Sequence, residues 1–192
     1  MTRIMIVVGH PEQDSFCAAL GHAYETGARA GGHSVDFFDL SRMSFDAILR
    51  GGYHRLQPLE PDLEAARRAL WQCDHVVIVF PLWLGDMPAI LKGFFERIMQ
   101  PSLLEKQAQG PAASWKFFEK KSARVVITMG MPGFIYRLWF GAHALKLLKR
   151  NILHFVGIKP VEATILGGIA SVSAEQRQAW LKDMERLGAR AG

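Results

Sequence analysis

Residues 80–97 read Phe-Pro-Leu-Trp-Leu-Gly-Asp-Met-Pro-Ala-Ile-Leu-Lys-Gly-Phe-Phe-Glu-Arg, and this stretch decides the fold. The run before it, from His75 to Phe80, is almost wholly apolar, which is typical of a strand buried on both faces of a parallel sheet. The prolines and glycine that follow predict a loop that leaves the sheet sharply, and a helix is expected from Pro88. Ligands of open α/β sheets bind at the carboxyl ends of strands, so the apolar loop indicates a wall for a flat ring. A strand, loop and helix without any ligand would show the same pattern.

The rest of the chain alternates between the same two patterns. Apolar runs predict further strands at 4–8, 35–40, 125–128 and 161–166. Amphipathic spacing predicts further helices from Asp14 or Ser15 to 30, and at 62–72, 141–155 and 174–187. Residues 41–61 and 100–119 contain helix breakers and are expected to be irregular. The pattern predicts a single α/β domain over residues 1–192, built as a three-layer doubly wound sheet of five strands.

Composition narrows the possible functions. The chain has 192 residues, of which 49% are hydrophobic, with a net charge of +5 and a pI of about 9.4. Its basic residues form no long run, so we expect no nucleic-acid partner and a surface that favours anionic cofactors or substrates. Cys17 and Cys73 lie in apolar surroundings and are expected to be buried thiols, with no metal site. The absence of a leader pattern and of a bilayer-length apolar run favours a soluble, cytoplasmic protein.

A second loop with polar groups follows the first predicted strand. Gly9, His10 and Pro11 lead to Ser15 at the expected start of a helix. Free amides at a helix start attract phosphate, and Ser15 and His10 add a hydroxyl and an imidazole. The segment matches neither a GxGxxG nor a Walker motif, and an ordinary capped turn would have the same sequence.

A third candidate segment follows the fourth predicted strand, where Gly130 and Gly133 precede Tyr136 and His143. If this segment is helical, the spacing would place Tyr136 and His143 on one face, about two turns apart. A phenol and an imidazole there could hold and pass charge beside a ring that accepts hydride. Taken singly, Tyr136 also suits an interfacial aromatic, and His143 a helix residue bonded to the backbone. Together the three segments predict one groove, with phosphate at the first and a planar ring against the other two.

These residues resemble a known family. Gly-His-Pro-x-x-x-Ser-Phe at 9–16 and Phe-Pro-Leu…Pro-Ala-Ile-Leu-Lys-Gly-Phe-Phe-Glu-Arg at 80–97 resemble motifs of the NAD(P)H:quinone oxidoreductases of the flavodoxin-like fold. That family includes the drug-activity modulator proteins and the ancillary subunits of potassium-efflux systems. Residues 152–157 also resemble the family's segment before its last strand. The resemblance covers nearly the whole chain, and it implies a parallel sheet with the strand order 2-1-3-4-5.

The resemblance implies a flavoenzyme that binds FAD or FMN non-covalently, takes electrons from NAD(P)H and forms a homodimer. By position, the phosphate side of the flavin would contact His10, Ser15 and Phe16, and Arg177 would reach an adenosine phosphate if the cofactor is FAD. The ring would lie along Pro81, Leu82, Trp83 and Leu84. Its other edge would face Thr128, Met129, Gly130 and Met131.

Tyr136 and His143 would match the catalytic pair that the family uses beside the flavin. A partner subunit contributes an aromatic loop in the animal enzymes, and Trp115, Phe117 and Phe118 would take that place here. We therefore expect an NAD(P)H dehydrogenase (quinone)-like flavoprotein that reduces quinones or similar acceptors by two electrons. Because donor and acceptor share one pocket, the expected kinetics are ping-pong.

Two other functions stay open at this stage. One is a flavin-binding regulatory subunit that acts on a membrane transport partner, and the other is a small electron carrier. The apolar segment 134–140 suits a lid over the acceptor, a dimer surface or a patch that contacts a membrane surface. The sequence does not choose between FAD and FMN or between NADH and NADPH.

Overall fold

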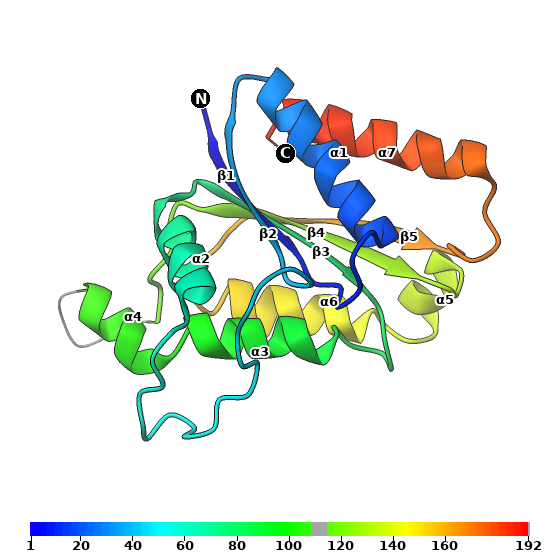
Figure 1. Cartoon of the computed structure of the whole chain (residues 1–192). Coiled ribbons are helices and arrows are strands. Elements are labelled where there is room, and N and C mark those ends of the chain that lie inside the picture. Colours follow the sequence, from blue (N-terminus) through cyan, green and yellow to red (C-terminus); the bar gives the residue numbers. More distant parts are fainter. Residues whose placement is uncertain (109–114, 192) are drawn as a thin grey trace.

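The computed structural model describes residues 1–108 and 115–191, and Figure 1 shows its three layers. The strands are β1 (Arg3–Val8), β2 (Ser34–Asp39), β3 (His75–Pro81), β4 (Ser122–Met129) and β5 (Val161–Gly167). The helices are α1 (Phe16–Ala30), α2 (Pro61–Gln72), α3 (Ala89–Ile98), α4 (Pro101–Ala108), α5 (Gly133–Leu138), α6 (His143–Leu147), the π-helical η1 (Leu148–Leu153) and α7 (Ala174–Ala189). All five predicted strands are present.

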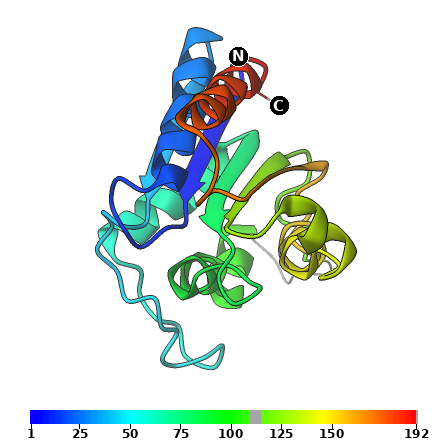
Figure 2. The same ribbon diagram turned by 90° about the vertical axis from the view of Figure 1, so that its right-hand side faces the viewer.

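The five strands form one parallel sheet in the order β2-β1-β3-β4-β5. This is the order that the family resemblance implied. The pairings Val8↔Val79 and Pro81↔Thr128 bring the ends of β1, β3 and β4 to the same edge of the sheet. We call it the carboxyl edge; it lies at the right in Figure 1 and faces the viewer in Figure 2.

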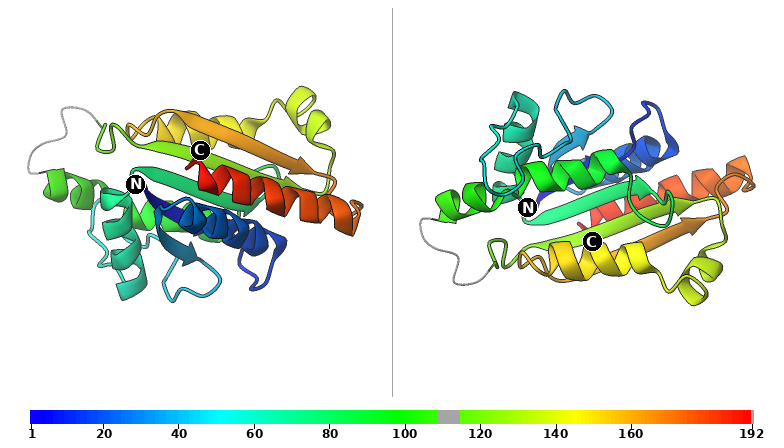
Figure 3. Two further views of the ribbon diagram at one scale, coloured as in Figure 1. Left: turned by 90° about the horizontal axis from the view of Figure 1, so that it is seen from above. Right: turned by 90° about the horizontal axis from the view of Figure 1, so that it is seen from below.

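Helices cover both faces of the sheet, which explains why its central strands are apolar along their whole length. In β1, Ile4 and Ile6 point into the core shared with α1 and α7, while Met5 and Val7 point into the opposite core. Every residue of β3 is buried. Figures 1 and 3 show α1 and α7 on one face and α2, α3 and α6 on the other. Buried parallel strands have no solvent face, so alternation between apolar and polar residues is lost.

The two helices of the first layer begin at serine caps. Ser15 precedes α1, and its Oγ accepts a hydrogen bond of 3.2 Å from the amide of Ala18. Ser173 precedes α7 and accepts in the same way from Gln176, also at 3.2 Å. A serine side chain at this position satisfies one of the amides that a helix start leaves unpaired. Ser15, one of the two predicted caps, is therefore the residue that starts α1.

The prediction of irregular structure over 100–119 is wrong in its first half, where α4 begins at Pro101. The helix forms because proline suits a first helical position and Leu104 packs into the core. Phe118 is fully buried against Trp71, with ring centroids 4.8 Å apart, so it belongs to this subunit's own core. That burial leaves Trp115 and Phe117 as the aromatic side chains available to a partner subunit; the rest of the expected aromatic loop, residues 109–114, lies outside the described residues.

Both cysteines are buried free thiols, as predicted. Burial raises the pKa of each to about 11, which keeps them protonated at neutral pH. Within the described part of the chain, no helix is both long and apolar enough to cross a membrane.

Candidate functional site

The loop after β3 folds back as a tight hairpin at the carboxyl edge. Trp83 and Asp86 exchange two backbone hydrogen bonds of 2.9 Å. Between them Leu84 and Gly85 have φ values of 48° and 82°, and a type I′ turn requires positive φ at both positions. The turn places the Leu84 side chain fully in solvent at the tip and leaves Trp83 half-exposed. The hairpin thus presents a half-exposed indole beside the end of β3.

The loop after β1 meets this hairpin. The rings of His10 and Trp83 lie edge to face, with centroids 5.2 Å apart. His10 Nδ1 accepts a hydrogen bond of 3.0 Å from the amide of Glu12, so a neutral imidazole carries its proton on Nε2. A Cβ on Gly9 would lie 2.7 Å from Leu91 Cδ2, which shows how closely this loop sits on α3. Two of the predicted segments therefore form one wall, with an imidazole N–H available to donate.

Positive charge gathers at the start of α1. Phe16 and Cys17 are its first residues, and their amides have no intrahelical acceptor. Arg177 of α7 lies over the Phe16 ring, with Cζ 5.7 Å from the ring centroid. One guanidinium nitrogen of Arg177 donates to the carbonyl of Ile169 at 2.7 Å, which fixes the side chain beside the helix start. A helix N-terminus together with a held guanidinium suits a phosphate group.

The end of β4 contributes backbone groups and an open space to the candidate site. Thr128 is 1% exposed and its Oγ1 lies 3.3 Å from Cys17 Sγ, so its side chain serves the core beneath α1. Met129 is buried as well, while Met131 is half-buried. Gly130 is exposed, and a Cβ there would meet nothing within 4 Å. A flat ring could therefore approach the backbone at Gly130, but the side chains of Thr128 and Met129 are not available to it.

The prediction that Tyr136 and His143 share one helical face is wrong. The helix α5 ends at Leu138, and the chain then turns through Gly141 and Ala142, whose φ values are 59° and 50°. Consecutive left-handed residues cannot continue a right-handed helix, so α6 begins anew at His143. Tyr136 is 2% exposed, whereas His143 is exposed. The first turn of α6 still links the two segments, because the Tyr136 hydroxyl accepts a hydrogen bond of 3.1 Å from the amide of Leu145.

The surroundings of Tyr136 keep its phenol protonated. Burial raises its pKa, the amide of Leu145 acts in the opposite direction, and the negative charge of Asp86 raises it further. The hydroxyl accepts from Leu145, so its own hydrogen can donate elsewhere. Asp86 is a residue of this site that the sequence reasoning missed. The only signal for it was its place in the hairpin loop.

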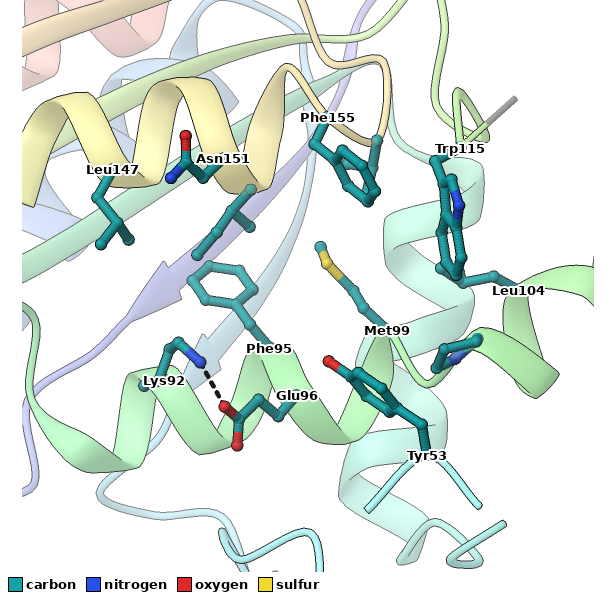
Figure 4. A pocket seen from close by; sticks show the side chains of 13 residues that line it. Tyr53, Lys92, Phe95, Glu96, Met99, Leu104, Trp115, Leu147, Asn151 and Phe155 are labelled. Carbon is teal, nitrogen blue, oxygen red and sulfur yellow. Dashed lines mark hydrogen bonds and ion pairs between the residues drawn. The ribbon is translucent and has the colours of Figure 1, made fainter. Parts of the chain in front are cut away.

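An apolar groove lies away from these residues, between α3 and η1 (Figure 4). Its volume is about 580 Å³, and Figure 4 shows Tyr53 and Trp115 at one end and the Lys92–Glu96 ion pair along one wall. None of the predicted flavin residues lines it. The carboxyl edge is therefore an open wall, and the groove is a separate feature.

The carboxyl edge fits a flavin on three observations. The start of α1 with Arg177 can hold phosphate, the half-exposed Trp83 offers an aromatic side chain, and the open space at Gly130 allows close approach to the backbone. The same set would accept FMN, and Arg177 would be available to the second phosphate of FAD.

Known proteins are similar to this chain over nearly its whole length. A family model described as the flavodoxin-like fold matches residues 2–189. The chain is 26% identical to an uncharacterized NAD(P)H oxidoreductase of Haemophilus influenzae, covering 93% of this chain and 90% of the relative. It is 27% identical to NAD(P)H dehydrogenase [quinone] 1 of Rattus norvegicus, covering 96% and 77%. The solved NAD(P)H:quinone oxidoreductase from Methanothermobacter marburgensis is similar with a TM-score of 0.80 and 25% identity, covering 98% and 95%.

Proposed function

The chain belongs to the flavodoxin-like fold family, and from that premise we propose that it is a flavin-dependent NAD(P)H oxidoreductase that reduces quinones or similar acceptors. One observation carries the proposal: relatives named as NAD(P)H oxidoreductases or quinone dehydrogenases match this chain over more than nine-tenths of its length. The residues at the carboxyl edge add support, because they offer a phosphate site, an aromatic wall and a protonated phenol in one place.

In this proposal each part of the edge has a separate task. The start of α1 holds the phosphate that FMN and FAD share, and Ser15 fixes the geometry of that helix start. Arg177 stands beside it for the second phosphate if the cofactor is FAD. Pro81, Leu82, Trp83 and Leu84 bound the ring from one side, and the backbone from Thr128 to Met131 bounds it from the other. A bound flavin would supply reversible two-electron hydride chemistry. The protein would stabilise negative charge at the ring through fixed donors, namely His10 Nε2 and the hydroxyl of Tyr136.

A single substitution tests the role of Tyr136. We expect Tyr136→Phe to slow reduction by NAD(P)H by about a hundredfold while flavin stays bound, because the hydroxyl donor is lost and the ring remains. Anaerobic stopped-flow absorbance measures the rate, and filtration measures flavin retention. Tyr24→Phe is the matched control, since Tyr24 is a fully buried tyrosine in α1. Equal reduction rates in the Tyr136 variant and the wild type would remove Tyr136 from the mechanism.

Initial-rate kinetics test whether NAD(P)H and the acceptor bind in the same pocket. If donor and acceptor occupy the same place in turn, double-reciprocal plots at several quinone concentrations should be parallel lines. Intersecting lines would mean a ternary complex and therefore two separate sites.

Arg177 provides a way to separate FAD from FMN. We expect Arg177→Met to weaken FAD binding about tenfold and to leave FMN binding less affected if the guanidinium contacts a phosphate that FMN lacks. Calorimetric titration of each apoprotein with both flavins decides this. An equal loss for FAD and FMN would place Arg177 at the phosphate that the two cofactors share.

We also infer that the protein is a homodimer, as the family resemblance implies, and that it acts in the cytoplasm. The groove between α3 and η1 offers a second copy an apolar surface that includes Phe95, Met99 and Phe155. Sedimentation velocity should give twice the monomer mass, and Phe155→Asp, at a half-exposed position on that groove, should return the protein to a monomer. A wild-type protein that sediments as a monomer would refute the dimer without bearing on the flavin chemistry.

A further inference from the structure

The loop that precedes α1 is acidic, although it lies at the proposed phosphate site. Residues 9–16 contain Glu12 and Asp14 but no Lys or Arg, and both carboxylate residues are exposed. Asp14 stands directly before Ser15, the cap of α1. A carboxylate at a helix start is attracted by the same amides and the same dipole as a phosphate group. The loop therefore carries a competitor for the ligand that its amides would bind.

An arginine from a neighbouring segment restrains the Asp14 carboxylate. Arg42, which follows β2, donates from Nη2 to Asp14 Oδ1 at 3.1 Å. In the parts of the chain that the structure describes, this is the one ion pair of Asp14. The contact joins the loop after β1 to the segment after β2, and Figures 1 and 2 show the two next to each other. Arg42 thus draws the carboxylate toward β2.

Arg42 is itself anchored by a buried carboxylate at the end of β2. Its Nε lies 3.3 Å from Asp39 Oδ2, and the Asp39 side chain is only 7% exposed. Asp39 Oδ1 accepts hydrogen bonds from the amide and the hydroxyl of Ser41, at 3.0 and 2.7 Å. The amide of Arg42 donates to the Asp39 carbonyl at 3.0 Å. A guanidinium fixed in this way can direct a second carboxylate, because its donors lie in one rigid plane.

The two arginines near the start of α1 therefore have different surroundings. Arg42 comes from the β2 end of the sheet and pairs with two carboxylates, whereas Arg177 comes from the helix that follows β5 at the opposite end. Within residues 1–108 and 115–191, no carboxylate pairs with Arg177. The acid of the loop is neutralised by the first arginine, and the second stays available to an anion.

We propose that Arg42 is a positioning residue of the phosphate site: it holds the Asp14 carboxylate toward β2 and so keeps the amides of α1 open to the flavin phosphate. Without Arg42, the carboxylate would be free to turn onto those amides and to repel the phosphate. In this role Arg42 acts through Asp14 and does not contact the flavin. The inference rests on the proposed function, because it concerns the phosphate of the same flavin.

Calorimetric titration of the apoprotein with FMN, FAD and riboflavin tests this role, since riboflavin has the same ring and lacks the phosphate. We expect Arg42→Met to weaken FMN and FAD binding about tenfold and riboflavin binding less than about twofold. Asp14→Asn alone should stay within about twofold of wild type for all three ligands, because its carboxylate is already restrained. The double variant Arg42→Met/Asp14→Asn should recover FMN binding to within about twofold of wild type, because the competing carboxylate is gone.

Two further variants separate positioning from general stability. Arg29→Met removes an exposed arginine that pairs with Glu25 at the other end of α1, and it should leave the preference for FMN over riboflavin unchanged. Arg42→Lys keeps a cation beside the buried Asp39 but lacks the fork that reaches a second carboxylate. It should lose less FMN affinity than Arg42→Met, and Asp14→Asn should again recover the loss. This pair of variants also provides the test if Arg42→Met fails to fold.

Three results would overturn the proposal. Equal losses for FMN and riboflavin in the Arg42 variants would show a general structural role. A loss of FMN affinity that Asp14→Asn does not recover would show that Arg42 does not act through Asp14. Unchanged FMN affinity in both Arg42 variants would show that the carboxylate does not compete.

The wild type reports separately on the proposed function. A wild type that binds no flavin would refute the proposed function and, with it, the role of Arg42. A wild type that binds flavin and is reduced by NAD(P)H, together with any of the three results above, would refute the role of Arg42 alone.

Discussion

The two helical layers differ in how closely their helices approach each other. Across one face, α1 and α7 meet at Gly27 and Gly188: a Cβ on Gly27 would lie 1.9 Å from the carbonyl oxygen of Glu185, and one on Gly188 would lie 2.1 Å from that of Tyr24. Across the other face, α3 and η1 are held apart by large side chains and leave a groove of about 580 Å³. The same sheet thus carries a closed and an open layer, because residue size at the contact sets the distance between helices.

The open layer is held together from outside by an irregular segment. Residues 41–60 contain no helix or strand, yet Arg97 of α3 is fully buried beneath them. Its guanidinium donates to Glu60 Oε2 at 2.8 Å, to the Pro58 carbonyl at 2.7 Å and also to the carbonyl of Asp46. Burial works against the ionised form of Glu60, but the bonds from Arg97 and from the amide of Asp46 outweigh it and hold its pKa below the usual value. We conclude that a buried charge orders this segment.

The largest predicted effect comes from removing that charge. Arg97→Met should lower the free energy of unfolding by about 4 kcal/mol, because it leaves Glu60 and two carbonyls without their partner. Urea denaturation measures the change. Arg29→Met is the control: Arg29 pairs with Glu25 at 2.7 Å on the surface and should cost less than about 1 kcal/mol. Equal costs at the two positions would mean that Arg97 does not hold the open layer.

The next effect comes from forcing the closed layer apart. Gly27→Ala should lower the free energy of unfolding by about 3 kcal/mol, although alanine favours a helix, because the added methyl group meets backbone. Gly130→Ala adds the same methyl group where nothing lies within 4 Å and should leave stability unchanged. Denaturation curves of the two variants that coincide with the wild type would show that α1 and α7 can separate freely.

The layer formed by α1 and α7 should also make the stability of the protein sensitive to acid. His75 is 3% exposed beneath Tyr24 of α1, and burial, with a smaller contribution from the positive charge of Arg124, lowers its pKa to about 4. The unfolded chain binds the proton near the ordinary value of about 6.5, so the unfolded state binds more protons between the two values. Stability should therefore fall as the pH drops through this window, by about 2 to 3 kcal/mol.

The variant His75→Asn isolates that effect. Asparagine can keep the hydrogen bond that joins His75 Nδ1 to Ser122 Oγ at 2.7 Å, and it does not titrate. Unfolding free energies measured across the window should fall less steeply with acid in the variant than in the wild type. Parallel pH profiles would assign the acid sensitivity to other groups.

The smallest predicted effect comes from removing the serine caps of α1 and α7, which we expect to differ in their influence on flavin binding. Ser15→Ala and Ser173→Ala should each cost about 1 kcal/mol, because each removes one cap hydrogen bond of the same length. Only Ser15→Ala should also weaken flavin binding, since α1 starts at the proposed phosphate site. Calorimetric titration with FMN checks this, and equal flavin affinities in the two variants would remove Ser15 from that site.

Much of the fold was predictable because its signals are local. Apolar runs marked all five strands, and serine followed by an amphipathic pattern marked the start of α1. The loops after β1, β3 and β4 were placed at one edge, since the ends of parallel strands must meet there. The contact between His10 and Trp83 and the approach of Arg177 to Phe16 agree with that reasoning.

The errors arose where a local pattern depended on distant contacts. The spacing of Tyr136 and His143 permits one helix, but left-handed residues at Gly141 and Ala142 break it, and the glycine alone did not reveal this. Breakers suggested an irregular chain at 100–119, but packing of Leu104 into the core supports α4. In each case the tertiary environment overrode the local preference.

The sequence by itself determined the succession of strands and helices along the chain and the buried character of the central strands, and it predicted the edge at which we propose that a ligand binds. Those features follow from periodicity over a few residues, which the chain carries wherever it folds. Only the tertiary structure decided the burial of Arg97 with Glu60, the gap between α3 and η1, and the exposure of Trp139. These features depend on side chains brought together from distant positions in the chain. Such contacts follow no periodic pattern in the sequence, so they could not be predicted from it.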